Sequence, residues 1–358
     1  MDRNALLDAA AFTGTTDLAA ERVGGKVLHA NDEFFAEKEN LIKPGRGVFI
    51  ADKYTEQGKW MDGWETRRKR VPGYDWCILQ LGIPGAIHGL DIDTNHFLGN
   101  NPAYASVDAL NASGEMSVQE LLKDSTQWTE ILSKVPLKPG SQNIFAVASK
   151  ERWTHLRLNI YPDGGVARFR VHGEARPDFA KFGKDDVLDL AAIENGGKVS
   201  CASDMFFGNK DNLIMPGRSA NMGDGWETKR RRGPGHDWTI VQLGHAGNLK
   251  KVEVDTNFFK GNYPDSFWLE GVYAPGEEIT VLNWNQYDWK PILPQTKLQA
   301  HNRHYYDTES DKQGPWTHVR LSIAPDGGVS RLRLMGTLHK TEGSPTGKRE
   351  EVKSGAAH

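Results

Sequence analysis

Apolar and polar side chains alternate along several stretches of the chain, most clearly within residues 167–172, 251–255, 318–323 and 331–334. This period of two residues predicts strands that turn one face to a core and the other to solvent or a cleft. Turn residues at 161–165 and at 324–328 join pairs of these strands as hairpins. The pattern therefore predicts short antiparallel strands separated by turns.

Helical patterning is weak in comparison. Residues 117–124 are the best helix candidate, and residues 185–193 form a second one. The chain also holds 38 glycines and 17 prolines, which favour turns over long helices. Many short strands with few helices predict an all-β fold built of β-sandwiches, most plausibly jelly rolls.

One long motif occurs twice. MDGWETRRKRVPGYDW at 61–76 returns as MGDGWETKRRRGPGHDW at 222–238, and the shorter landmarks GGKV, PGR, DTN, WTH and PDGGV recur around it in the same order. Two copies of so long a unit indicate tandem domains rather than a solenoid. We predict an N-terminal segment (1–20), a first jelly-roll repeat (21–173), a linker (174–195), a second repeat (196–336) and a disordered C-terminal tail (337–358).

Composition excludes several classes of protein. The net charge of −3 argues against a nucleic-acid binder that acts through a broad positive field. Cys77 and Cys201 stand at non-equivalent places in the two copies, so neither a disulfide framework nor a cysteine zinc site is expected. The sequence shows no membrane span and no signal peptide. We therefore expect a cytoplasmic protein that binds neither nucleic acid nor membrane.

The landmarks PGR, GWETRR or GWETKRRR, PGxDW, QLG, DTNxF and GNxP, taken in order over both copies, resemble the allantoicase family. The resemblance implies two tandem jelly-roll domains with a galactose-binding-like fold. It also implies hydrolysis of allantoate to ureidoglycolate and urea, in purine catabolism, by a homo-oligomer. No cofactor is predicted, although dependence on a divalent metal stays open.

Allantoate carries a carboxylate and two ureido groups on one carbon, so its hydrolysis sets three tasks. Arginine binds a carboxylate best, and His, Asp or Glu can protonate the leaving urea nitrogen and activate water. The two GWET segments are the densest supply of such groups. Their catalytic candidates are Glu65 and Glu227, and their substrate-binding candidates are Arg67, Arg68, Arg70, Arg230 and Arg231. The alternative is structural ion pairing on a sandwich edge.

Differences between the copies are a second source of candidates, because a role performed once need not recur. His96, His236 and Asp265 align with different residues in the other copy, namely Phe258, Tyr74 and Ala103. We predict these three residues to be acids or bases of the reaction. For each histidine the alternative is a hydrogen-bonded loop residue.

Loops at the ends of strands supply the remaining substrate-binding candidates. Asn95 and Asn257 belong to the DTN motifs, and Arg46 and Arg218 belong to the PGR motifs. Such rims often bind ligands, although Asp-Thr-Asn is also ordinary turn chemistry.

A metal site is not predicted. His301, His304 and Asp307 in HNRHYYD could form part of one, but the segment reads as a loop without fixed ligand geometry.

Two other functions remain open. A tandem module that binds carbohydrate or another ligand would use the aromatic residues Trp284, Tyr287 and Trp289, and a different hydrolase or lyase would act on ureidoglycolate. The recurring Trp64, Trp76, Trp226 and Trp238 are expected in the core.

Overall fold

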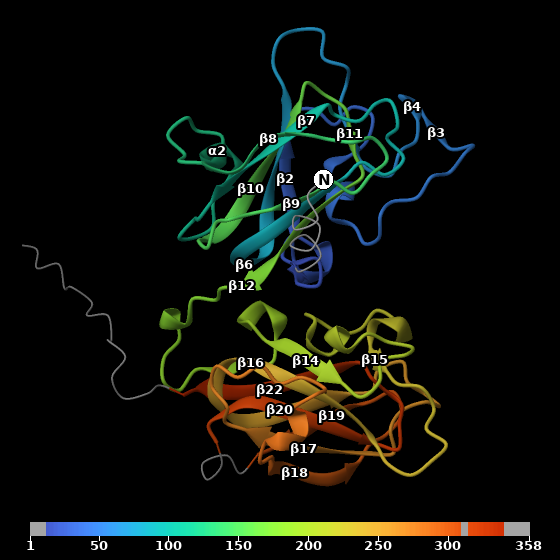
Figure 1. Cartoon of the computed structure of the whole chain (residues 1–358), viewed down its shortest axis with the longest axis vertical. Coiled ribbons are helices and arrows are strands. Elements are labelled where there is room, and N and C mark those ends of the chain that lie inside the picture. The colour runs from blue at the N-terminus through green and yellow to red at the C-terminus, as the bar shows by residue number, and fades with distance from the viewer. Residues whose placement is uncertain (1–11, 309–313, 340–358) are drawn as a thin grey trace, which may run out of the picture.

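The computed structural model describes residues 12–308 and 314–339. It contains two β-sandwiches stacked along the long axis of the molecule, the first coloured blue to green and the second yellow to red (Figure 1). In the described ranges, no helix is both long enough and apolar enough to cross a membrane.

The first sandwich is organised around one long strand, β6 (Asp75–Asp93). The first half of β6 pairs with β2 and β10, and the second half pairs with β12 and β9. The strand therefore belongs to two layers, ordered β2-β6-β10-β7-β8 and β1-β12-β6-β9. The other strands are β1 (Thr16–Asp17), β2 (Lys26–Ala30), β3 (Tyr54–Thr55), β4 (Gly58–Lys59), β5 (Trp64–Glu65), β7 (Tyr104–Leu110), β8 (Thr129–Pro136), β9 (Ile144–Ala146), β10 (Arg152–Tyr161), β11 (Gly165–Val166) and β12 (Arg168–Ala175).

The second sandwich repeats this plan around β16 (Asp237–Asp255), which has the same 19-residue length as β6. Its layers are β14-β16-β20-β17-β18 and β13-β22-β16-β19, and all pairings are antiparallel. The remaining bounds are β13 (Val187–Asp189), β14 (Lys198–Ala202), β15 (Trp226–Glu227), β17 (Ser266–Val272), β18 (Lys290–Lys297), β19 (Arg303–Asp307), β20 (Trp316–Ala324), β21 (Gly328–Val329) and β22 (Arg331–Leu338). We call β1-β12-β6-β9 and β13-β22-β16-β19 the small sheets, and the other two layers the large sheets.

Helices are short, as predicted. They are η1 (Glu21–Val23), η2 (Lys38–Ile42), α2 (Val118–Leu121), η3 (Phe179–Lys181), η4 (Ile193–Asn195), η5 (Lys210–Ile214), η6 (Met222–Asp224) and η7 (Trp284–Gln286). A capping box between Ser117 and Glu120 starts α2 inside the predicted segment.

The core lies between the two layers of each sandwich. The predicted strand is present as β20, and Val319, Leu321 and Ile323 are fully buried as expected. Its other face is less exposed than predicted, because His318 and Ser322 are buried as well. Trp64 and Trp226 are buried as expected. Trp76 and Trp238 instead stay partly exposed on the outer faces of the large sheets, because their strand neighbours at 77 and 239 take the inward positions.

The domain boundaries differ from the predicted ones. Residues 16 and 17 form β1, which pairs with β12, so the first domain includes part of the predicted N-terminal segment. The predicted helix at 185–193 is instead the strand β13 followed by η4. Leu188 and Leu190 pack in the core of the second domain, which explains why this part of the predicted linker is a strand.

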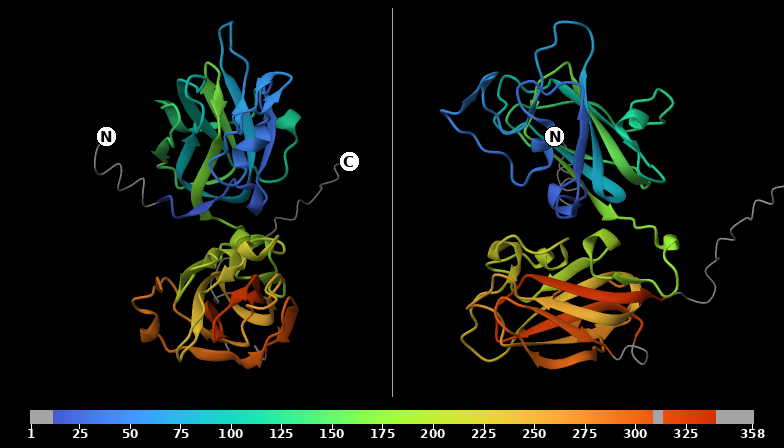
Figure 2. Two further views of the ribbon diagram at one scale, coloured as in Figure 1. Left: turned by 90° about the vertical axis from the view of Figure 1, so that its right-hand side faces the viewer. Right: turned by 180° about the vertical axis from the view of Figure 1, so that it is seen from behind.

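Figure 2 shows the two sandwiches from the side and from behind. Buried apolar side chains of both domains belong to one continuous cluster, and a polar contact also joins the domains. Arg22 of η1 donates to Asn212 at 3.0 Å and forms an ion pair of 3.2 Å with Asp224. Phe179 of η3, in the segment that connects the two domains, meets the ring of His245 in the second domain edge-on, with 5.0 Å between the ring centroids.

Candidate active site

Arginines and carboxylates gather on the outer face of each small sheet. In the second domain they line a pocket of about 300 Å³ that has four arginines and four acids in its wall. Its lining residues are Asp189, Glu194, Gly217, Arg218, Glu253, Asp255, Arg303, Arg331, Arg333 and Met335. Concave sites with convergent charged groups are the usual places for small polar ligands.

Two arginines of β22 form the base of this pocket and hold the loops above it. Arg331 is 2% exposed and donates to the backbone oxygen of Gly217 and to both the backbone and the carboxylate of Asp224. Arg333 donates to the backbone oxygens of Met215 and Gly217 at 2.6 and 2.7 Å. Both guanidinium groups donate to backbone oxygens of the PGR loop and therefore fix its position.

The rim of the pocket carries ion pairs that a ligand can reach. Arg218, half exposed, lies 3.3 Å from the carboxylate of the fully buried Asp255. The backbone N–H of Asn257 donates to the same carboxylate. Arg303 binds Glu253 through two hydrogen bonds of 2.8 and 3.0 Å, and this contact raises the pKa of Arg303.

The first domain builds the same frame. Arg46 holds Asp93 with hydrogen bonds of 2.7 and 3.0 Å, as Arg218 holds Asp255. Arg168 pairs with Asp62 at 2.9 Å in the place of Arg331 and Asp224. Arg170 donates to the backbone oxygens of residues 43 and 45, as Arg333 does to 215 and 217. The duplication therefore preserved the frame of the cluster.

Four lining positions differ between the domains. One is Glu194, whose counterpart in the first domain is Arg22, and the other three change the chemistry around the carboxyl groups. The first domain has Asp91, Gln142 and His172 where the second has Glu253, Arg303 and Met335. Gln142 donates to one oxygen of Asp91 at 2.7 Å. The other oxygen, Oδ1, is buried and has no hydrogen-bond partner among the described residues.

The environment of Asp91 suits an acid. Burial raises the pKa of Asp91, because the neutral amide of Gln142 compensates a buried charge less than a guanidinium does. The Glu253 carboxylate, in contrast, is paired with Arg303. Burial also raises the pKa of Asp189 in the second cluster, but the Asp189 carboxylate accepts from two backbone N–H groups and pairs with Arg333. Among the described residues of these clusters, Asp91 beside the accessible Arg46 is the carboxyl that has both a raised pKa and an oxygen without a hydrogen-bond partner.

Four of the predicted site residues belong to these clusters: Arg46, Arg218, Asn95 and Asn257. His96 follows Asn95 but is exposed, with its ring 5.6 Å from Phe49. Its φ of 67° matches the 68° of Phe258. The position is therefore the left-handed residue of the same turn in both copies.

The GWET candidates lie elsewhere and are paired locally. Glu65 accepts a hydrogen bond from Asn100 at 2.6 Å, and burial raises the pKa of Glu65. Arg67 pairs with Asp32 at 2.6 Å. In the second domain Asn262 likewise donates to Glu227. Arg231 forms an ion pair with Asp237. Arg68, Arg70 and Arg230 are exposed.

His236 and Asp265 also lie away from the arginine clusters. His236 precedes the end of β16 that belongs to the large sheet, and its ring lies 4.6 Å from that of Trp268. Burial lowers the pKa of His236, and Arg320 and Arg231 lower it further. Asp265 is exposed and pairs with Lys297 at 2.6 Å. The structure therefore does not bring these two residues together with His96.

Asp91, Gln142 and His172 were not among the predicted residues. A sequence signal for two of them was present in the alternating strands. LDID in the first copy aligns with VEVD in the second, and FRVH aligns with LRLM. A comparison restricted to the outward positions of these strands would have found Asp91 and His172. Gln142 has no such signal, since it lies in a loop outside the motifs.

The segment that could have contributed to a metal site is engaged in backbone hydrogen bonds. His304 contacts the backbone oxygen of Val254 and accepts from the N–H of Gln299, while His301 accepts from the N–H of Phe258. In the part of the chain that the structure describes, no group of three or more His, Cys, Asp or Glu side chains could hold a metal ion.

Known proteins resemble this chain in sequence and in fold. Residues 16–176 and 188–339 each match the allantoicase repeat. The chain is 48% identical to a probable allantoicase of Burkholderia mallei, over 90% of this chain and 95% of that one. It is 49% identical to the allantoicase of Dictyostelium discoideum, over 89% and 86% of the two chains.

The crystal structure of the allantoicase from Saccharomyces cerevisiae superposes with a TM-score of 0.75 at 36% identity, covering 94% of this chain and 98% of that one. The likeness confirms the predicted all-β fold of two jelly-roll repeats. With both repeats matched over most of the sequence, the chain belongs to the allantoicase family.

Proposed function

We propose that the chain is a hydrolase that converts allantoate to ureidoglycolate and urea. The observation that carries this proposal is the match of both repeats, over nearly the whole described chain, to a family whose relatives are named allantoicase. The arginine clusters on the small sheets supply the carboxylate recognition that this substrate requires.

We assign turnover to the first domain. Arg46 exposes about half of its side chain and can move from Asp93 to the substrate carboxylate. Asp91, behind it, is the group placed to protonate the leaving urea nitrogen. His172 lies on the same outward face of β12 as Arg170 and can accept the proton of the attacking water.

The reaction balances with these groups alone. The bond between the central carbon and one ureido nitrogen breaks, and that nitrogen takes a proton and leaves as urea. The water oxygen bonds to the same carbon and gives up a proton to the base. The product keeps the carboxylate, the second ureido group and a new hydroxyl, which is ureidoglycolate, and no electrons are transferred.

The activity is tested by incubating the purified full chain with allantoate and measuring urea and ureidoglycolate. We expect the two products in equal amounts. The same assay with ureidoglycolate as substrate tests the alternative hydrolase or lyase. Turnover of ureidoglycolate without turnover of allantoate would overturn the proposal.

The placement of the site is tested by a matched pair of variants, Arg46→Gln and Arg218→Gln. We expect Arg46→Gln to lower kcat/KM by about a hundredfold or more, since a charge-assisted bidentate contact is lost. Arg218→Gln should leave most of the activity. Equal losses would place turnover in both domains, and loss in Arg218→Gln alone would place it in the second.

A further inference from the structure

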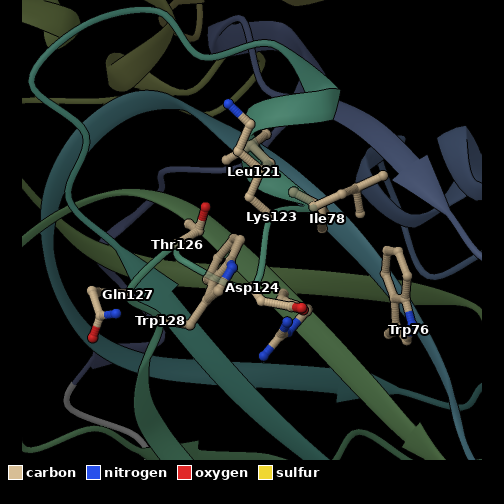
Figure 3. Close-up of a pocket in the computed structure, with 10 residues that line it drawn as sticks. Trp76, Ile78, Leu121, Lys123, Asp124, Thr126, Gln127 and Trp128 are labelled. Carbon is tan, nitrogen blue, oxygen red and sulfur yellow. The ribbon is translucent and has the colours of Figure 1, made fainter.

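A second pocket lies on the outer face of the large sheet of the first domain, away from the arginine clusters. It has a volume of about 480 Å³. Trp76 of β6 and Trp128, just before β8, line it together with Ile78, Leu121 and Arg157 (Figure 3). None of these residues enters the proposed reaction, so the pocket needs its own explanation.

The second domain fills the same place with its own side chains. Trp238, the counterpart of Trp76, has the ring of Trp284 at 4.6 Å. Trp238, Trp284 and Tyr287 pack there on a small cluster that includes Ile240. The aromatic residues of NWNQYDWKP are therefore largely packing residues, not the exposed binding platform that the sequence suggested.

Matching backbone hydrogen bonds identify what replaces Trp284 in the first domain. The N–H of Trp284 donates to the oxygen of Thr280 at 3.1 Å, and the N–H of Leu121 donates to that of Ser117 at 3.1 Å. The position of Trp284 thus corresponds to Leu121. By the same pattern Tyr287 corresponds to Thr126. Each lies two positions before a tryptophan, Trp289 or Trp128, whose backbone N–H donates to its backbone oxygen. The rings of Trp284 and Tyr287 are thus replaced by the smaller, non-aromatic side chains of Leu121 and Thr126.

The groups that surround Trp284 remain in the first domain. Arg320 lies over two rings, Trp284 at 5.0 Å and Trp289 at 5.1 Å. Its counterpart Arg157 lies over Trp128 at 5.1 Å. Arg157 keeps its carboxylate partner Asp108, at 2.9 Å. The first domain therefore retains the tryptophan and arginine walls that hold an aromatic ring in the second.

A hydrogen-bond donor in this pocket points to a second feature of the ligand. The indole N–H of Trp289 donates to the backbone oxygen of Trp284 at 2.8 Å. The corresponding Nε1 of Trp128 is buried and has no hydrogen-bond partner in residues 12–308 and 314–339. A buried N–H of this kind is costly unless an acceptor reaches it.

The chain itself cannot supply the ring from the segments outside the described residues. Residues 1–11, 309–313 and 340–358 contain no Phe, Tyr or Trp. We propose that this pocket binds a small ligand with a planar ring and a neighbouring carbonyl or equivalent acceptor. The ring stacks between Trp76 and the Arg157 guanidinium, and the acceptor takes the N–H of Trp128.

The probe is N-acetyltryptophanamide, which reproduces the ring and carbonyls of Trp284 as a free molecule. Binding to the full chain is measured by ligand-observed saturation-transfer NMR, with N-acetylleucinamide as the apolar control and indole as the ring without a carbonyl. We expect the tryptophan amide to bind, the leucine amide not to bind, and indole to bind about three- to tenfold more weakly.

Two variants test the position of the ligand. Leu121→Trp restores the side chain of the second domain and should lower the affinity by at least about tenfold while allantoate turnover and the unfolding temperature are kept. Trp128→Phe should abolish the preference for the amide over indole. Its matched control, Trp289→Phe, should leave that preference unchanged.

Three results would overturn the proposal. The first is equal binding to the native chain and to Leu121→Trp. The second is displacement of the probe by saturating allantoate, which would place it in the substrate site. The third is a change of oligomeric mass in Leu121→Trp, which would make the pocket a contact between copies of the chain. Loss of turnover by the native chain would disprove only the proposed reaction, not this site.

Discussion

Single buried side chains show how polarity is balanced against burial in this fold. His155 and His318 occupy equivalent places on β10 and β20, and each contacts the hydroxyl of the preceding threonine. Nε2 of His318 is buried and has no partner among the described residues. Burial lowers the pKa of His318 from 6.5 to about 4. Each of these histidines is therefore a neutral structural residue.

The lowered pKa predicts a loss of stability in acid. Between pH 6.5 and about 4 His318 binds a proton in the unfolded chain but stays neutral in the folded chain. The free energy of unfolding therefore falls as the pH falls. The contribution is about 2 kcal/mol between about pH 7 and pH 5. Urea unfolding of His318→Gln should show a pH dependence that is flatter by that amount.

The counterpart variant His155→Gln is a second, independent test of the same effect. Burial lowers the pKa of His155 as well, so its effect should have the same sign. Identical slopes of stability against pH in the native chain and in His318→Gln would show that another group causes the acid sensitivity.

Asp91 is expected to change the stability of the fold with pH in the opposite direction to His318. Its pKa is raised by burial, so the folded state favours the protonated form and loses stability as the pH rises through its titration range. Asp91→Asn should therefore stabilise the fold at neutral pH, and the gain should vanish toward acid pH. Turnover should fall in the same variant. A loss of stability at neutral pH would contradict this assignment.

At the scale of elements, the strands β12 and β22 hold the loops of the arginine clusters through buried guanidinium groups. Arg168 is 3% exposed and binds both the backbone oxygen and the carboxylate of Asp62. Arg331 does the same with Asp224. A strand and a loop more than 100 positions apart in sequence are thus joined in each domain.

Removal of either arginine should loosen its loop and destabilise its domain. We expect Arg168→Met to cost about 3 kcal/mol, because Asp62 loses its guanidinium partner, and Arg331→Met to cost somewhat less, because Asp224 keeps its ion pair with Arg22. Urea unfolding measures this cost. The exposed Arg232→Met is the control, with an effect within about 0.5 kcal/mol. A cost below about 1 kcal/mol would mean that the backbone alone holds these loops.

The same elements show which parts of the structure the sequence could predict. Alternation and the repeat predicted the strands at 167–172 and 318–323 and the two-domain plan, because side-chain period and duplication are local signals. The helix predicted at 185–193 is wrong, since pairing of β13 with β22 overrides local helix propensity. Of the site, Arg46 and Arg218 were found by motif. Asp91 was missed because the outward positions of the paired strands were not compared between the copies, and Gln142, which contacts Asp91, carries no sequence signal of its own.

On the scale of the whole molecule, a polar contact joins the two domains beside the apolar cluster that they share. The Arg22 guanidinium is half exposed, and it reaches the same Asp224 that Arg331 holds in the second domain. This contact links the N-terminal turn of one sandwich to the edge of the arginine pocket of the other.

Loss of this contact should change the arrangement of the domains more than their stability. Arg22→Ala should alter the unfolding temperature by no more than one or two degrees, because an exposed ion pair contributes about 0–1 kcal/mol. Small-angle X-ray scattering should show a broader distribution of interdomain distances. Unchanged scattering would indicate that the remaining contacts, such as those of β12 with η4 in the shared apolar cluster, fix the orientation.

The long strand that each domain shares between its two layers has a further consequence. Since β6 and β16 each contribute hydrogen bonds to both layers, neither layer can peel away while the other stays intact. Each sandwich should therefore open as one cooperative unit in hydrogen exchange. New termini made by circular permutation would be tolerated in the hairpin of β3 and β4, but a cut within β6 would sever both layers at once.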